Sequence, residues 1–149
     1  MRHVAIVSGI IAEILLCCFA TGCLASNSKD EVATVASPDG VVEAVVIETN
    51  GGATTSFGYE IELREKGRRH SESVAYIYGA VRNQNAYGVN AKWMSNRELR
   101  LQYLTAKSET LEKERVTIAG REITIALQTG VLDPSAPAGG MLYNLEHAR

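Results

Sequence analysis

The sequence predicts a mostly β protein: a single small antiparallel β domain of seven or eight strands, forming a sandwich or a curled sheet, after an N-terminal signal helix. The clearest observation is the alternation at 57–64, where apolar and charged side chains take turns. A second is the run rich in β-branched residues at 41–49. The third is that turn sequences, Ser-Pro-Asp-Gly at 37–40 and Asn-Gly at 50–51, bracket this run.

The first 22 residues have the pattern of a secretory signal peptide. Arg2 supplies a positive charge near the start, an apolar run follows at 4–20, and small residues precede Cys23. The residues Phe-Ala-Thr-Gly-Cys at 19–23 resemble the lipobox of bacterial lipoproteins, whose signal peptide is cleaved just before a lipid-modified cysteine.

This resemblance implies a diacylglyceryl thioether and an N-acyl group on Cys23, a bacterial source, and a lipid-anchored position on the cell membrane, facing the periplasm or the exterior. Leu24 stands where Asp usually signals inner-membrane retention, so the outer membrane is expected if the source is Gram-negative. Ala20 stands where the family usually has Leu, and Glu13 interrupts the apolar run. The alternatives are a retained transmembrane anchor, an ordinary cleaved signal, and an intracellular protein whose first element is residues 4–20.

Four segments make up the predicted organisation. They are a signal peptide at 1–22, a lipidated flexible tether at 23–29, an antiparallel β domain at 30–129 and a loosely packed C-terminal tail at 130–149. Met141, Leu142 and Tyr143 are the residues expected to pin the tail.

Composition excludes some partners. The chain has 149 residues and a formal net charge of −2 at pH 7, which gives no electrostatic footprint for nucleic acid and no polybasic membrane patch. Its three cysteines are Cys17, Cys18 and Cys23, of which the first two leave with the signal peptide and the third would carry lipid. The mature domain is therefore expected to lack disulfides and to depend on packing for its stability.

Eight segments have strand patterns, separated by turn or loop sequences. They are 31–36, 41–49, 57–64, 73–78, 88–94, 99–103, 115–119 and 122–127. The segment 41–49 is apolar on both faces, which predicts a central strand. In the segment 73–78, Val74, Tyr76 and Tyr78 are expected to share one face.

Residues 107–114 are the sole helix candidate. Glu109 and Lys113 are four residues apart, in the order that favours a helical ion pair. Leu111 is almost the only apolar residue of the segment, so the alternatives are a single turn or a loop.

Two places are candidates for ligand or partner contact. In the loop after the second strand, Gly51, Gly52, Thr54 and Thr55 offer backbone N–H groups and hydroxyls that could hold an anion. A plain loop is the alternative, because a phosphate loop requires a following helix and a strand follows here. Trp93, the only tryptophan, is expected to be a core anchor or, in an open groove, a stacking surface for a ligand.

The region from residue 37 to about 103 resembles a family of small, uncharacterised bacterial envelope proteins. The features that carry the resemblance are Ser-Pro-Asp-Gly at 37–40, Gly-Gly-Ala-Thr-Thr at 51–55, Lys-Trp at 92–93, Asn96 and the strand at 99–101. The family is a domain of unknown function. The resemblance therefore implies a secreted, lipid-anchored protein and no particular activity.

Common catalytic motifs are missing from the mature sequence, including the nucleophile elbow, the zinc-binding His-Glu-x-x-His and Cys-x-x-Cys. We therefore expect a non-enzymatic binding, inhibitory or assembly-accessory module without cofactor or metal. Its partners would be membrane lipid through acylated Cys23 and an envelope protein or cell-wall polymer. The alternative is a small periplasmic hydrolase with a loop-built site near His70 and Glu72, or Glu60 and Glu62.

Overall fold

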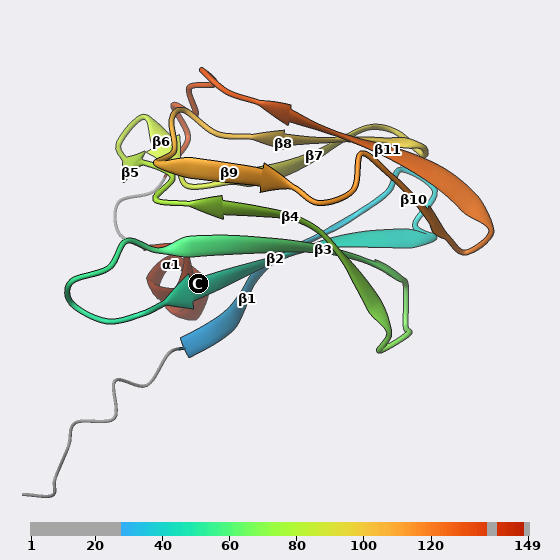
Figure 1. Cartoon of the computed structure of the whole chain (residues 1–149), viewed down its shortest axis with the longest axis horizontal. Helices are drawn as coiled ribbons and strands as arrows, with labels where there is room; N and C mark the ends of the chain where they lie inside the picture. Colours follow the sequence, from blue (N-terminus) through green and yellow to red (C-terminus); the bar gives the residue numbers. More distant parts are fainter. Residues whose placement is uncertain (1–27, 137–139, 148–149) are drawn as a thin grey trace, which may run out of the picture.

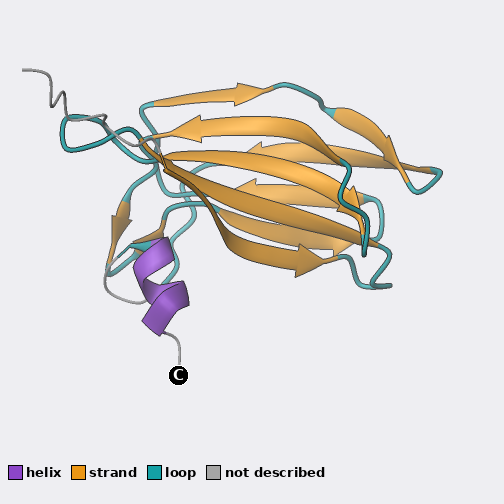
Figure 2. Cartoon of the chain, turned by 90° about the horizontal axis from the view of Figure 1, so that it is seen from below, coloured by secondary structure: helices purple, strands orange, loops and turns teal. Residues whose placement is uncertain are grey.

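The computed structural model describes residues 28–136 and 140–147. The predicted signal peptide, Cys23 and the tether up to residue 27 lie outside these residues. Within them, two β-sheets stack face to face, and a short hairpin and a helix lie at one end (Figures 1 and 2).

The larger sheet has five strands, and each neighbouring pair is antiparallel. In spatial order they are β1 (Ser28–Ala36), β2 (Val42–Asn50), β3 (Gly58–Glu65), β4 (Ser71–Tyr78) and β9 (Ser108–Leu111). Ser28 and Lys29, which the sequence placed in the tether, therefore belong to the first strand.

The smaller sheet has four strands, and it contains one parallel pair, β11 with β8. In spatial order the strands are β10 (Arg115–Ile118), β11 (Arg121–Gln128), β8 (Glu98–Gln102) and β7 (Asn90–Ser95). A separate hairpin joins β5 (Arg82–Asn83) to β6 (Ala86–Tyr87), and α1 (Met141–His147) follows the last strand.

The predicted fold class is confirmed, and each of the eight predicted segments contains a strand. The described residues hold eleven strands rather than seven or eight, because β5, β6 and β9 add to the expected set. Residues 107–114, the helix candidate with a single turn or a loop as alternatives, contain a strand. Residues 108–111 instead pair with the edge of β4, and Lys113 bonds Glu72 rather than Glu109.

The core lies between the two sheets and follows from the alternation in the sequence. Tyr59, Ile61 and Leu63 of β3 are fully buried there, as the period-two pattern predicted. The β2 strand lies between β1 and β3 and is buried on both faces at residues 44–46, which confirms its central position.

One strand departs from simple alternation. A β-bulge opposite the junction of Ile61 and Glu62 shifts the register of β4. Val74 is consequently buried in the core, whereas Tyr76 and Tyr78 are half-buried on the outer face of the sheet. The prediction that these three side chains share a face is wrong for Val74.

The helix α1 packs at the end of the sandwich where the β5–β6 hairpin lies (Figure 2). Met141 is buried and Leu142 packs against the core, whereas Tyr143 is exposed. Two of the three residues expected to pin the C-terminal segment thus contact the core. Among the described residues, no helix is long and apolar enough to cross a bilayer.

Candidate functional site

An open hollow of about 370 Å³ lies on the outer face of the five-stranded sheet, beside the start of β1 and the β2–β3 loop. We call it the outer hollow. Its lining residues are Ser28 and Lys29 of β1, Thr49 and Asn50 of β2, Gly51, Thr55 and Ser56 of the loop, Glu60 of β3, and Tyr76 and Tyr78 of β4. It therefore combines neighbouring strands with one predicted contact loop.

A glycine allows Tyr76 to lie along the surface of the sheet. Tyr76 is paired with Glu60, yet its hydroxyl reaches Gly58, two residues back along β3. A Cβ atom at Gly58 would overlap that hydroxyl and would stand 2.5 Å from Thr49 Oγ1. The aromatic ring thus occupies the space that any other residue at position 58 would fill, a known way of covering glycine in a sheet.

Tyr78 and the loop hold the other side of the outer hollow. The Ser56 N–H donates to the Tyr78 hydroxyl oxygen at 2.9 Å. Within the loop, the Gly52 N–H donates to Asn50 Oδ1 at 2.9 Å, and the Thr55 N–H donates to the Gly52 carbonyl at 3.1 Å. Two N–H groups that an anion cradle would need are therefore already used.

The structure brings only some of the predicted contact residues together. Gly51 and Thr55 line the outer hollow, whereas Gly52 and Thr54 do not. Trp93 also lies elsewhere: its Nε1–H donates to the Val35 carbonyl at 2.9 Å, so it joins β7 of one sheet to β1 of the other.

The charges in the outer hollow cancel each other. Lys29 Nζ lies 2.7 Å from Glu60 Oε2, and the hydrogen bond to Glu60 raises the pKa of Lys29. Glu60 and Glu62 are both on the outer face, as predicted, but Glu60 is held in this ion pair. Lys29 and Glu60 together therefore add no net charge to the wall of the hollow.

The second predicted catalytic pair lies at the other end of β3 and β4. His70 Nε2 is 3.3 Å from Glu72 Oε1, but the His70 side chain is 85% exposed. Lys113 Nζ lies 2.6 Å from Glu72 Oε2, and this contact lowers the pKa of Glu72. Glu72 is therefore held in its ionised form, which suits an ion pair better than a general acid.

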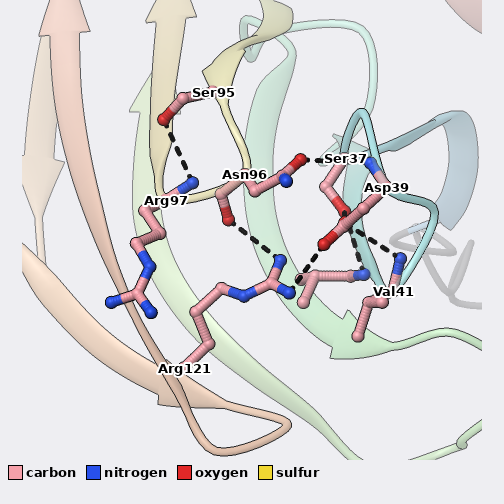
Figure 3. A network of polar contacts seen from close by, with 8 residues as sticks. Ser37, Asp39, Val41, Ser95, Asn96, Arg97 and Arg121 are labelled. Carbon is pink, nitrogen blue, oxygen red and sulfur yellow. Dashed lines mark hydrogen bonds and ion pairs between the residues drawn. The ribbon is translucent and has the colours of Figure 1, made fainter.

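A polar cluster that sequence reasoning missed joins three turns; we call it the Asp39 cluster (Figure 3). Asp39 Oδ2 lies 2.6 Å from Arg121 Nη2, and Asp39 Oδ1 accepts from the Ser37 hydroxyl at 2.7 Å. Asn96 Oδ1 accepts from the Asp39 N–H at 3.1 Å, and the Asn96 carbonyl accepts from Arg121. Hydrogen bonds from Arg121 and Ser37 hold the pKa of Asp39 well below its usual range.

A second missed group, the Glu48 cluster, lies at the α1 end of the core. Glu48 Oε2 is 2.9 Å from Arg82 Nη1 and accepts from the Tyr59 hydroxyl at 3.3 Å. The Arg82 guanidinium lies 3.7 Å over the Phe57 ring. Burial raises the pKa of Glu48.

The sequence held a partial signal for each cluster. The Ser-Pro-Asp-Gly turn marked Asp39, and Glu48 falls at an inward position in the alternation of β2. Neither Arg121 nor Arg82 is near its carboxylate in the sequence, so the pairs themselves could not be predicted.

The described residues contain no group of three or more His, Cys, Asp or Glu side chains that could hold a metal ion. Comparisons with protein-family models, with curated proteins and with solved structures found no match. The function of the chain is therefore inferred from its own residues and their geometry.

Proposed function

We propose that the chain is a non-enzymatic binding module of a bacterial cell envelope, anchored through acylated Cys23 and facing the periplasm or the exterior. The observation that carries this proposal is that a lipobox-like sequence is followed closely by the first strand of the folded domain. The lipobox-like residues 19–23 stand only five positions before Ser28, where β1 begins. With Leu24 after the cysteine, the outer membrane is the expected location in a Gram-negative cell.

Lipid attachment at Cys23 would hold the outer hollow close to the bilayer. Five residues span at most about 18 Å, and Ser28 and Lys29 themselves line the hollow. Each buried acyl CH₂ contributes about 0.8 kcal/mol, so two or more chains suffice for stable attachment. A partner would therefore be an envelope protein or a cell-wall polymer that comes within this distance of the membrane.

The state of the carboxylates favours binding over hydrolysis. Glu60 is paired with Lys29, and Glu72 is paired with Lys113 with a lowered pKa. A general acid requires the opposite shift. The hydrolase hypothesis stays a prediction; it requires a hydrolytic activity that is lost on substitution of His70 and Glu72, or of Glu60 and Glu62.

Metabolic labelling with a fatty acid tests the anchor. We expect the wild type to take up label and Cys23→Ala to remain an unlabelled, unprocessed or soluble precursor. Cys18→Ala is the matched control, because it removes a neighbouring thiol within the predicted signal peptide and should leave labelling unchanged. Equal labelling of the wild type and Cys23→Ala would contradict the proposal.

Site-specific photo-crosslinking in intact cells tests the binding surface. A photoreactive residue at Thr55, on the rim of the outer hollow, is expected to give a discrete adduct with an envelope component. The same residue at Met94, which is 45% exposed on β7, serves as the control. Equal adducts from both positions would show that the outer hollow is not the contact surface.

A further inference from the structure

We propose that the outer hollow binds a neutral sugar chain, which deepens and rests on the proposed binding function by naming its ligand class. The inference comes from three properties that occur together at this place. They are two tyrosine side chains that line the hollow, a rim of neutral hydrogen-bonding groups, and an ion pair whose two charges compensate each other.

Each of the two tyrosine side chains is held in position by a contact with the backbone. Tyr76 lies across Gly58, and Tyr78 accepts a hydrogen bond from the Ser56 N–H at 2.9 Å. Because both tyrosines are half-buried, each presents part of its ring to the hollow. Rigid aromatic rings provide contact area at a low cost in conformational entropy, and the CH groups on one face of a sugar ring can stack on them.

The rim suits hydroxyl groups. Thr49 and Ser56 contribute hydroxyls, and the side-chain NH₂ of Asn50 is a donor whose partner oxygen already accepts from the loop. The Thr55 hydroxyl donates to the Gly52 carbonyl at 3.0 Å, so it offers an acceptor only. A hydroxyl can both donate and accept, which matches the double capacity of each sugar hydroxyl. An acyl chain would leave these polar groups without partners, at a free-energy cost.

The compensated charges of the hollow favour a neutral ligand over a charged one. Lys29 and Glu60 face each other at 2.7 Å, so the charge of each is compensated by the other, although the Lys29 side chain is 67% exposed. The N–H groups of Gly52 and Thr55 are also engaged within the loop. The volume of about 370 Å³ is at the lower end for small-molecule sites, and the hollow is open, so a longer chain could continue beyond it.

Saturation-transfer difference NMR tests the proposal on the full chain, purified in a zwitterionic detergent without a sugar headgroup. The probes are chitotetraose, whose rings are N-acetylated, and cellotetraose, whose rings are not. We expect transfer to at least one probe, strongest for its ring CH protons. Transfer to chitotetraose alone would point to an N-acetylated envelope glycan, and transfer to both would point to stacking without recognition of the substituent.

Variants at one position separate stacking from a general loss of structure. Tyr76→Ala is expected to weaken binding about tenfold, whereas Tyr76→Phe keeps the ring and should bind nearly as well as the wild type. Tyr143→Ala removes an exposed tyrosine on α1 that does not line the hollow, and should leave binding unchanged. Equal binding by Tyr76→Ala and the wild type would overturn the proposal.

A measurement on the wild type alone covers the case in which Tyr76→Ala fails to fold. With ¹³C-labelled threonine methyl groups, sugar binding should shift the signals of Thr49 and Thr55, while Thr117 and Thr124 of the smaller sheet stay fixed. Absence of transfer and of methyl shifts for both sugars overturns the inference. Because this assay needs no acyl group, it can fail while the labelling of Cys23 succeeds, or succeed while that labelling fails.

Discussion

Two arginine–carboxylate pairs lie toward opposite ends of β2, and burial separates their behaviour. Asp39 and Arg121 are 2.6 Å apart with side chains 27% and 20% exposed, whereas Glu48 and Arg82 are 2.9 Å apart with side chains 5% and 17% exposed. The pKa of Asp39 is lowered by its hydrogen-bond donors, but the pKa of Glu48 is raised by burial despite its arginine. An arginine at similar distance therefore does not fix the direction of the shift.

The two pairs should depend on pH in opposite ways. The stability that Asp39 contributes is present above the ordinary pKa of Asp and is lost as the pH falls through its lowered folded-state value. Glu48 has a raised pKa, so its contribution is greatest below the ordinary pKa of Glu and decreases as the pH rises through the folded-state value.

Arg82→Ala should have the largest effect on stability. It leaves the buried Glu48 carboxylate without its arginine, and we expect a loss of about 3 kcal/mol at neutral pH. The loss should shrink at acidic pH, where Glu48 becomes neutral, and it can be measured by urea unfolding at both pH values. The double variant Arg82→Ala with Glu48→Gln is the control and should be more stable than Arg82→Ala alone. A loss that is the same at both pH values would contradict this account.

Ala119→Asn should stabilise the end of the molecule that holds the Asp39 cluster. Ala119 and Gly120 have φ values of 50° and 70°, as in a type I′ hairpin turn, and this conformation is strained for alanine. Asparagine followed by glycine is preferred there, and we expect a gain of about 1 kcal/mol. Gly120→Ala is the matched control. A Cβ atom at Gly120 would meet no atom within 4 Å, so this variant should be destabilised only by the positive φ of the backbone. If Ala119→Asn melts at or below the melting temperature of the wild type, Ala119 is not strained in this turn.

Asp39→Asn should have the smallest effect. Its ion pair with Arg121 lies at the surface, where water and salt screen it, so its loss should lower the melting temperature less than Arg82→Ala does. The difference from the wild type should decrease at high salt and at acidic pH, where the wild type loses the same interaction. A melting curve that shifts by the same amount at low and high salt would show that the charge is not the source of the effect.

The regular part of the fold could be predicted because burial leaves a period of two in the sequence. Tyr59, Ile61 and Leu63 show this pattern without interruption and are fully buried. The strand β9 could not be found in this way, because its residues are mostly exposed and it is defined by its pairing with β4. The parallel pairing of β11 with β8 likewise depends on contacts distant in the sequence.

The candidate site was predictable only at its loop. Gly51 and Thr55 were identified from turn and hydroxyl chemistry, and both line the outer hollow. Tyr76 could not be assigned to the outer surface, because the bulge in β4 breaks the alternation and puts Val74 in the core. Gly58 leaves space for the Tyr76 hydroxyl, and the sequence alone does not show that these two residues are in contact.

The path of the chain between its layers limits how the molecule can assemble. After β7 and β8 the chain leaves the smaller sheet, adds β9 to the larger one and then returns with β10 and β11. When the N-terminal part of the chain is made first, the larger sheet stays incomplete until β9 is available, and the smaller sheet stays incomplete until β10 and β11 are available. Such long-range connections slow folding, so the partly synthesised chain would keep apolar surface uncovered and would be a natural client for chaperones.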